Sequence, residues 1–247
     1  MMSSTVEAVV PQLRSLVNAM HNIQIRQEIL DRLMARRGRI NFYETIDPKR
    51  TALVVIDMQN TFCAPGSPAE VASSRGIVPH INALAAELRK DGVPVIWVLH
   101  ANTQHKGRSD WELFYNHVVA GEVRARTLES NSPQNQAVYS ELQVGDEDIT
   151  IIKNRYSALT PGSSSLERVL RSMGIDSVLI AGTKTNVCCE STARDAMMMD
   201  FKVTMLSDCC GALSDEEHRS ALENIIQQFG NVMTSKEALE MMRSHKA

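Results

Sequence analysis

The chain has 247 residues, of which 43% are hydrophobic, and this suits one large α/β domain with a sizeable buried core. A formal net charge of −3 and an aromatic content of only 4% argue against a nucleic-acid partner. No apolar run approaches the length of a membrane span, and the amino terminus lacks the apolar core of a signal peptide. We therefore expect a cytoplasmic protein without a membrane partner.

Residues 1–45 are predicted to form a helical arm and a linker. Apolar residues recur there at helical spacing, with a break near Pro11, at Val9, Leu13, Leu16, Val17, Met20, Ile23, Ile25, Ile29, Leu30 and Leu33. An apolar face of this kind must pack against the body or a second subunit, so we expect a homo-oligomer, a dimer or tetramer, that involves the arm. Arginines crowd the end of the arm, but a basic membrane-surface helix is the weaker alternative because the first half carries little charge.

Residues 46–247 are predicted to form one domain in which strand-like and helix-like segments alternate. The expected strands are 51–56, 93–99, 149–152, 177–181 and 202–206. The expected helices are 77–90, 164–173, one that begins near 186, 215–229 and 235–243. This alternation implies an α/β fold, a doubly wound, mainly parallel sheet with helices on both faces. Residues 100–132 form a long polar segment of the kind that is usually functional or mobile.

The segment 179–198 places a cysteine at a turn. An aliphatic strand ends at Gly182, and a helical pattern begins near Asn186. If Thr185 or Asn186 is the N-cap, Cys188 falls in the first helical turn, where unpaired N–H groups and the helix dipole favour a thiolate. These features indicate a nucleophile. The alternative is a small buried core residue, which is the common fate of a free cysteine.

The chain contains five cysteines and no C-x-x-C pair, so we expect reduced thiols and no metal knuckle. Two of the cysteines, Cys188 and Cys189, are adjacent, and so are Cys209 and Cys210. We assign Cys189, Cys209 and Cys210 to core packing.

Five chemically useful residues are expected at or just past the carboxyl ends of strands: Asp57, His100, Lys153, Cys188 and Asp208. Ligands of open parallel sheets bind at this edge. There an aspartate can take a thiol proton, a lysine can stabilise anions, and a cysteine can attack a carbonyl. Taken singly, Asp57 could be a turn or cap residue and Lys153 a solvated surface lysine.

Three segments resemble the signature motifs of the isochorismatase-like cysteine hydrolases: VVIDMQNTF at 54–62, IIKNRYSAL at 151–159 and GTKTNVCCEST at 182–192. The resemblance covers about residues 50–235 and implies a six-stranded sheet. It also implies that Cys188 is the nucleophile, Asp57 the general base and acid, and Lys153 the third catalytic residue.

The resemblance further implies a cis peptide bond between Thr183 and Lys184. The backbone N–H groups of Lys184 and Cys188 would then form the oxyanion hole. It implies neither a cofactor nor a metal. His100 and His105 could suggest the metal site of nicotinamidases, but the tryptophan-histidine-proline context of that site is absent.

Within the family, the strings around Lys153 and Cys188 are most similar to those of members that hydrolyse ureidoacrylate, biuret or triuret. The expected partner is therefore a small amide or ureide, and the low aromatic content favours a linear polar one over a ring. Donors for such a substrate are expected at Gln104, Arg108, Arg124 and Arg126. The candidate substrate-binding residues are Gln59, Phe62, His100, Asn102, Arg155 and Tyr156. The stretch from Leu99 to Asn102 departs from the ureidoacrylate-type pattern.

Several alternatives stay open at this level. The substrate could be another small amide, of the N-carbamoylsarcosine, maleamate or nicotinamide type. A Cys188–His100 dyad is a weaker mechanistic alternative. The protein could also be a catalytically silent member of the fold that serves as a thiol sensor or an assembly subunit.

Overall fold

The computed structural model describes residues 21–245, and their centre is a six-stranded sheet with the strand order β5-β2-β1-β6-β7-β8. All neighbouring strands in this sheet run parallel. The strands are β1 (Thr51–Ile56), β2 (Val95–His100), β5 (Ile149–Lys153), β6 (Ser177–Thr183), β7 (Lys202–Gly211) and β8 (Asn231–Met233). The expected α/β fold with a six-stranded parallel sheet is thus confirmed.

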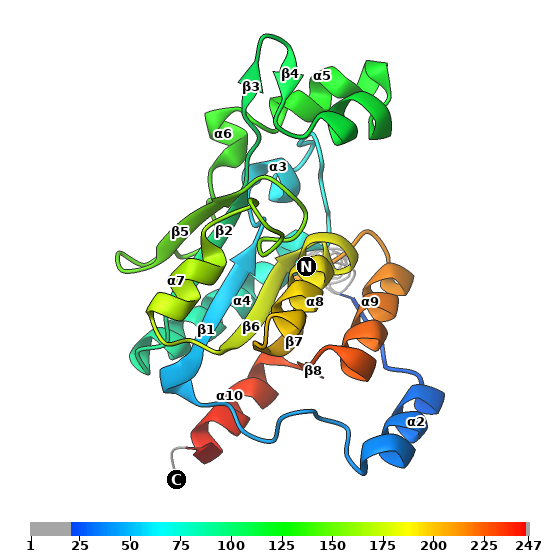
Figure 1. Cartoon of the computed structure of the whole chain (residues 1–247), viewed down its shortest axis with the longest axis vertical. Coiled ribbons are helices and arrows are strands. Elements are labelled where there is room, and N and C mark those ends of the chain that lie inside the picture. The colour runs from blue at the N-terminus through cyan, green and yellow to red at the C-terminus, as the bar shows by residue number, and fades with distance from the viewer. Residues whose placement is uncertain (1–20, 246–247) are drawn as a thin grey trace, which may run out of the picture.

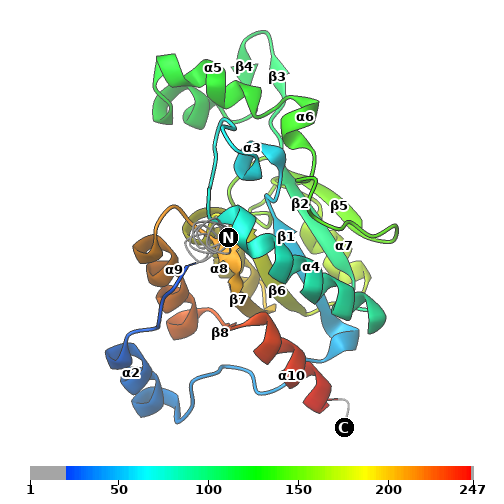
Figure 2. The same ribbon diagram turned by 180° about the vertical axis from the view of Figure 1, so that it is seen from behind.

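Helices cover both faces of the sheet (Figures 1 and 2). Helices α4 (Ser74–Lys90) and α10 (Ser235–His245) pack on one face, and α7 (Leu166–Ser172), α8 (Glu190–Met198) and α9 (Asp215–Gln228) pack on the other. Because β1 lies between the two layers, its side chains alternate between two apolar cores and all six residues are buried. This double burial explains why the strand reads as a continuous apolar run.

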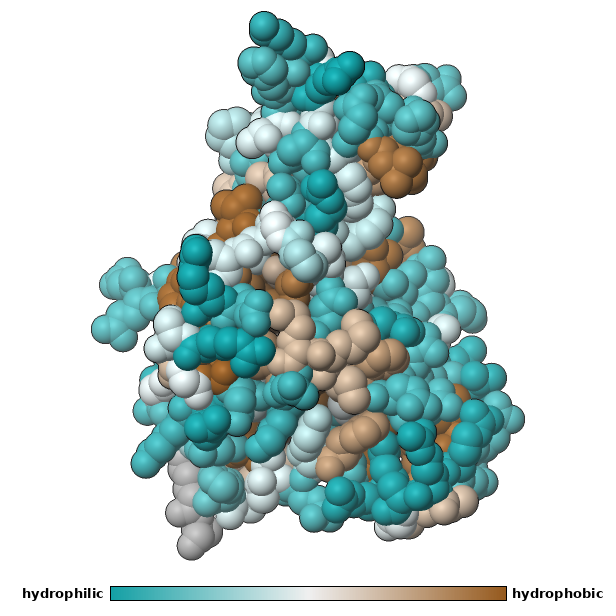
Figure 3. Space-filling view, in the orientation of Figure 1, coloured by the Kyte–Doolittle hydropathy of each residue, from teal (hydrophilic) through white to brown (hydrophobic). Residues whose placement is uncertain are grey.

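Residues 101–136 form a cap at one end of the domain, beyond the carboxyl end of β2 (Figure 1). The cap contains strands β3 (Gln104–His105) and β4 (Arg108–Ser109), the π-helix η2 (Phe114–Val118), and helices α5 (Gly121–Glu129) and α6 (Pro133–Gln136). The short helix α3 (Asn60–Cys63) lies beside it, whereas the short helix η1 (Pro48–Arg50) leads into β1 at the other end. Figure 3 shows a largely hydrophilic surface with a small apolar patch on the cap. The long polar segment after the second strand is therefore a folded unit.

The described part of the arm packs on its own domain. Helix α2 (Gln27–Arg37) buries Ile29 and Leu33 beside α9. Arg26 donates hydrogen bonds from its backbone and its guanidinium to the carboxylate of Glu223 on α9. This part of the apolar stripe thus has a partner within the chain, and the expected dimer or tetramer stays a prediction.

The predicted helical stripe of the arm is only partly observed. Residues 1–20 lie outside the described residues, and residues 21–26 are not helical. Ile23 and Ile25 nevertheless pack against the core on the α9 side of the sheet. Within residues 21–245, no helix is long and apolar enough to cross a membrane.

Candidate active site

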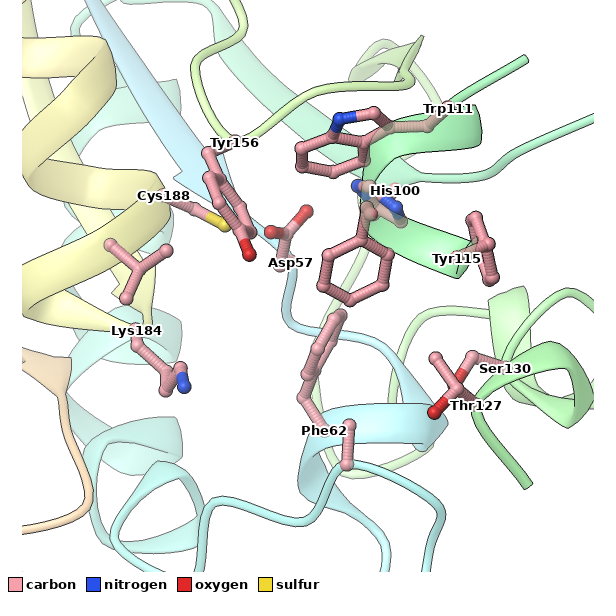
Figure 4. Close-up of a pocket in the computed structure, with 13 residues that line it drawn as sticks. Asp57, Phe62, His100, Trp111, Tyr115, Thr127, Ser130, Tyr156, Lys184 and Cys188 are labelled. Atoms are coloured by element: carbon pink, nitrogen blue, oxygen red, sulfur yellow. The ribbon is translucent and has the colours of Figure 1, made fainter. Parts of the chain in front are cut away.

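Asp57 is placed at the sheet edge by an unusual backbone conformation. It follows the buried strand β1, has a φ of 55°, and donates its backbone N–H to the carbonyl of Val98 on β2. A left-handed φ is uncommon outside glycine but is tolerated by aspartate, and it concentrates at functional sites. The turn carries the Asp57 carboxylate toward Cys188 (Figure 4).

Cys188 is positioned by a tight turn after β6. Gly182 has a φ of 118°, and a Cβ there would lie 2.0 Å from the carbonyl oxygen of Ile56, so only glycine fits beside β1. The peptide between Thr183 and Lys184 is cis, as the family resemblance implies. The π-helix η3 (Thr185–Cys189) then leads into α8.

The expected N-cap at Thr185 or Asn186 is wrong. Lys184 precedes η3 without a side-chain cap, and Thr185 Oγ1 lies 2.8 Å from Nδ1 of His218 on α9. The His218 ring stacks on His21 of the arm at a centroid distance of 4.3 Å. The turn that carries Cys188 is therefore held by a contact with α9 and not by a side-chain cap of its own.

His21 itself is fixed at both ring nitrogens. Its Nε2 accepts the backbone N–H of Ala212 at 2.8 Å, so Nδ1 carries the proton and donates to Asp215 Oδ1 at 2.7 Å. Burial and the neighbouring His21 lower the pKa of His218 to about 3, so His218 is neutral at pH 7. His21 of the arm thus packs on His218, and His218 in turn contacts Thr185 of the turn.

Asp57, Lys153 and Cys188 meet at the carboxyl edge of the sheet. Lys153 Nζ lies 2.8 Å from Asp57 Oδ2 and 3.6 Å from Cys188 Sγ. It also donates to the carbonyl of Arg155 at 3.0 Å. Lys153 is fully buried, which rules out the alternative of a solvated surface lysine. Within residues 21–245, neither Asp57 carboxylate oxygen accepts a well-directed hydrogen bond, although Oδ2 contacts the Lys153 ammonium.

The resting state of Cys188 is a thiol. Burial and the Asp57 carboxylate raise its pKa to about 12, although the Lys153 ammonium acts in the opposite direction. The prediction that the helix start favours a thiolate is therefore wrong, because burial and a neighbouring anion outweigh the local backbone. For Lys153, burial lowers the pKa, but the charges of Asp57 and Cys188 outweigh burial and raise it, so the ammonium persists.

His100 is a neutral part of the site. Burial and the Lys153 charge lower its pKa to about 4, and its Nδ1 lies 3.4 Å from Lys153 Nζ. Its Nε2 lies 2.7 Å from Asn102 Oδ1. Among the described residues no hydrogen bond joins His100 to Cys188, which leaves the alternative Cys–His dyad without geometric support.

Asp57 and Cys188 border a cavity of about 200 Å³, below the roughly 300–1,000 Å³ typical of drug-sized ligands. The lining of the cavity is largely aromatic, formed by Phe62, Trp111, Phe114, Tyr115 and Tyr156. These are five of the eleven phenylalanine, tryptophan and tyrosine residues of the chain. Figure 4 shows Tyr156 beside Cys188, with Phe62, Trp111 and Tyr115 farther from Cys188. The premise that few aromatics are available for the substrate is therefore wrong, because the fold concentrates them here.

Only part of the expected substrate-binding set lines this cavity. Phe62, His100 and Tyr156 do, whereas Gln59, Asn102 and Arg155 do not. Each of the last three instead makes hydrogen bonds within the protein.

Gln59 bonds the backbone N–H and carbonyl of His100 and also donates to the carbonyl of Gln136, and so ties the cap to β2. Asn102 Nδ2 donates to Asp110 Oδ1 within the cap. Arg155 donates to the carbonyls of Asn154 and Asp110.

The other expected donors also lie elsewhere. Gln104, Arg108, Arg124 and Arg126 do not line the cavity, and Arg126, for example, bonds the carbonyls of Gly66 and Ser67. Asp208 lies within β7, where its carboxylate accepts the backbone N–H of Ser235 at the start of α10. Cys189, Cys209 and Cys210 are buried, as expected. In the described part of the chain, no three His, Cys, Asp or Glu side chains cluster as a metal site would require.

Comparison with known proteins decides the family. The sequence model of the isochorismatase domain matches residues 51–237. The chain belongs to the isochorismatase family. The matched segment extends from β1 to the start of α10 and contains the whole Asp57, Lys153 and Cys188 cluster.

Family members similar to this chain differ in their described activities. The ureidoacrylate amidohydrolase RutB of Caulobacter vibrioides is 32% identical over 207 residues, which cover 77% of this chain and 90% of RutB. A probable inactive nicotinamidase of Arabidopsis thaliana is 33% identical over 172 residues, 69% of this chain and 85% of that protein. A cysteine hydrolase from Pseudomonas syringae pv. phaseolicola superposes with a TM-score of 0.69 at 28% identity, covering 83% of this chain and 98% of that one.

Two features of this isochorismatase-family site escaped the sequence analysis. The first is the part of the cavity lining that comes from the cap: Trp111, Phe114 and Tyr115. In the sequence these residues are visible as a cluster of aromatics within an otherwise polar segment. The second is the side chain of Lys184, which lines the cavity although only its backbone had been considered.

Proposed function

We propose that the protein is a cysteine-dependent amidohydrolase that cleaves a C–N bond of a small linear ureide through an S-acyl intermediate. The observation that carries this proposal is the contact of Lys153 with both Asp57 and Cys188 beside a small cavity. A nucleophile, a proton acceptor and a fixed cation are the groups that acyl transfer requires.

In the first step Cys188 Sγ attacks the substrate carbonyl carbon while its proton passes to Asp57. Because the resting thiol has a pKa of about 12, proton transfer has to accompany the attack. The carbonyl oxygen becomes an oxyanion, for which the backbone N–H groups of Lys184 and Cys188 are the proposed donors. Lys153 stays protonated and offsets the negative charge that moves from Asp57 to the oxyanion.

In the second step the C–N bond breaks and Asp57 returns the proton to the leaving nitrogen. A water molecule then attacks the S-acyl carbon and gives a proton to Asp57. The C–S bond breaks, the acid leaves, and Asp57 returns its proton to Cys188. One water molecule is consumed, and the proposed steps need no oxidant, reductant or cofactor.

The choice of a linear ureide is supported by the small cavity and by the similarity to RutB, a ureidoacrylate amidohydrolase. A second candidate is a ring amide of the nicotinamide type, which the aromatic wall around Trp111 and Tyr156 favours. Side-by-side kcat/KM values for ureidoacrylate, biuret and nicotinamide distinguish the two. A clear preference for nicotinamide would refute the linear-ureide assignment.

The reaction class is tested with two adjacent cysteines. Cys188→Ala should abolish turnover, whereas Cys189→Ala should retain most of it because Cys189 is fully buried and does not line the cavity. Intact-mass spectrometry during turnover should show an acyl adduct that disappears when substrate is exhausted. Equal rates for the two variants would contradict the nucleophile assignment. Absence of both adduct and turnover across ureides and amides would favour the silent, thiol-sensing alternative.

A further inference from the structure

Lys184 contributes a second, unused cation to the cavity. Its side chain is half-buried and lines the same cavity as Cys188. Figure 4 shows it on the Cys188 side, opposite Phe62 and separate from the Asp57 carboxylate. Among residues 21–245, its ammonium has no ion pair and no side-chain hydrogen bond. A positive charge on the wall of a substrate cavity is thus left without a counter-ion.

The charges around the cavity do not cancel. Asp57 is the acidic residue among those that line it, and Asp57 is already paired with Lys153 at 2.8 Å. His100 is neutral at pH 7, since its pKa is lowered to about 4. The remaining wall is aromatic, aliphatic or hydroxyl-bearing. Lys184 therefore gives the cavity lining one net positive charge.

We propose that the Lys184 ammonium binds a carboxylate of the substrate, which is therefore a monoanionic amide or ureide with a flat or apolar middle. This inference rests on the proposed function and specifies its substrate class. Lysine binds carboxylates as a point charge, and a charge-assisted hydrogen bond strengthens in a partly desolvated site. The aromatic wall opposite would pack the carbon atoms between the carboxylate and the scissile carbonyl.

The turn gives Lys184 two separate tasks. Its backbone N–H is a proposed oxyanion donor, while its side chain lines the cavity, where it would reach the other end of the substrate. Because both groups belong to one residue, binding of the carboxylate sets the distance between the anchored end and the attacked carbonyl. A neutral ureide such as biuret would leave the ammonium unpaired.

The test compares two ligands that differ in one charge. 3-Ureidopropionate carries a ureido group and a carboxylate, whereas n-propylurea has the same ureido group and no charge. Calorimetric titration of the full-length Cys188→Ala protein measures their binding without turnover. We expect 3-ureidopropionate to bind roughly 10- to 100-fold more tightly, the range of one hydrogen bond to a charged group.

Variants at Lys184 then assign the preference to this side chain. Lys184→Met keeps the length and removes the charge, so it should erase the preference while leaving n-propylurea binding unchanged. Lys184→Arg should restore most of the preference. Lys106→Met, which removes an exposed cation of the cap, is the matched control and should have no effect.

Each outcome bears on a different claim. Equal binding of the two ligands to the parent protein would overturn the carboxylate site. Equal weakening of both ligands in Lys184→Met would also overturn it, because the side chain would then only pack. If the charge preference is present but no ureide or amide is turned over by the unmutated enzyme, the inference about Lys184 stands and the proposed reaction fails.

Discussion

Replacing Asp57 with asparagine should make Cys188 more reactive toward an alkylating reagent while it abolishes catalysis. The Asp57 carboxylate is one of the two main causes that raise the thiol pKa to about 12. In Asp57→Asn that anion is gone, and the Lys153 ammonium, 3.6 Å from Sγ, loses its counter-ion. The remaining positive charge then favours the thiolate.

The size of the effect is set by the lost repulsion between the Asp57 carboxylate and the thiolate, both of which contact Lys153 Nζ, at 2.8 Å and 3.6 Å. Two unit charges about 4 Å apart interact by roughly 4 kcal/mol at an effective dielectric constant near 20, which sets an upper bound of about three pKa units. Because the surroundings relax after the substitution, we expect the pKa of Cys188 to fall by about two units. The fraction of Cys188 present as thiolate at pH 8 then rises about 100-fold. Because a less basic thiolate is a weaker nucleophile, by roughly 8-fold here, alkylation accelerates about tenfold.

The assay is the rate of iodoacetamide labelling at Cys188, resolved from the other cysteines by peptide mass spectrometry. Labelling of Cys63, which is fully buried, reports on any general loosening of the fold. Asp110→Asn, which removes a cap carboxylate, is the control and should leave the rate unchanged. Turnover of Asp57→Asn should fall by at least about 10² because the proton shuttle is lost. Slower or unchanged labelling would refute the claim that Asp57 keeps the thiol protonated.

Two further predictions concern the groups around Asp57 and Cys188. Lys153→Met should lower kcat by at least about 10² and, by leaving Asp57 buried without a partner, lower the unfolding free energy by roughly 3–5 kcal/mol, measured by denaturant titration. Adding Asp57→Asn should restore stability but not activity, and no recovery would contradict the ion-pair account. His21→Ala should lower kcat several-fold with little change in KM, because His21 backs the His218 ring. Arg26→Ala loosens the same arm without touching the His218 ring, so it should lower only Tm. If His21→Ala and Arg26→Ala lower kcat equally, the role of His21 is only structural.

The sheet could be predicted from sequence because its strands are buried on both faces. Such strands are continuous apolar runs, and β1 was placed to the residue. Strand β8 has only three residues, too few to form a pattern, and the six-strand count came from the family resemblance. The elements of the cap were missed because its helix α5 buries no residue and therefore carries no apolar stripe.

The cluster of Asp57, Lys153 and Cys188 was predictable for a topological reason. Asp57 and Cys188 follow β1 and β6, Lys153 ends β5, and parallel strands bring their carboxyl ends to one edge of the sheet. The protonation state of Cys188 was not predictable, since it depends on burial and on an anion more than a hundred residues away in sequence. The roles of Gln59, Asn102 and Arg155 in the scaffold also depend on contacts between the cap and the sheet, which no local pattern encodes.

A protonated resting nucleophile has a consequence for how this site works. With a thiol pKa of about 12, only roughly one Cys188 in 10⁵ is ionised at pH 7, so reagents and oxidants that need a thiolate meet an almost inert group. In the proposed mechanism the ionised form becomes favourable when a carbonyl occupies the cavity, because the charge then passes to an oxyanion that can receive hydrogen bonds. Asp57 would then have two opposed effects on one atom: its charge suppresses the thiolate before substrate binds, and its basicity removes the proton once substrate is bound. Asparagine at position 57 would lose both effects, which is why labelling and turnover should move in opposite directions.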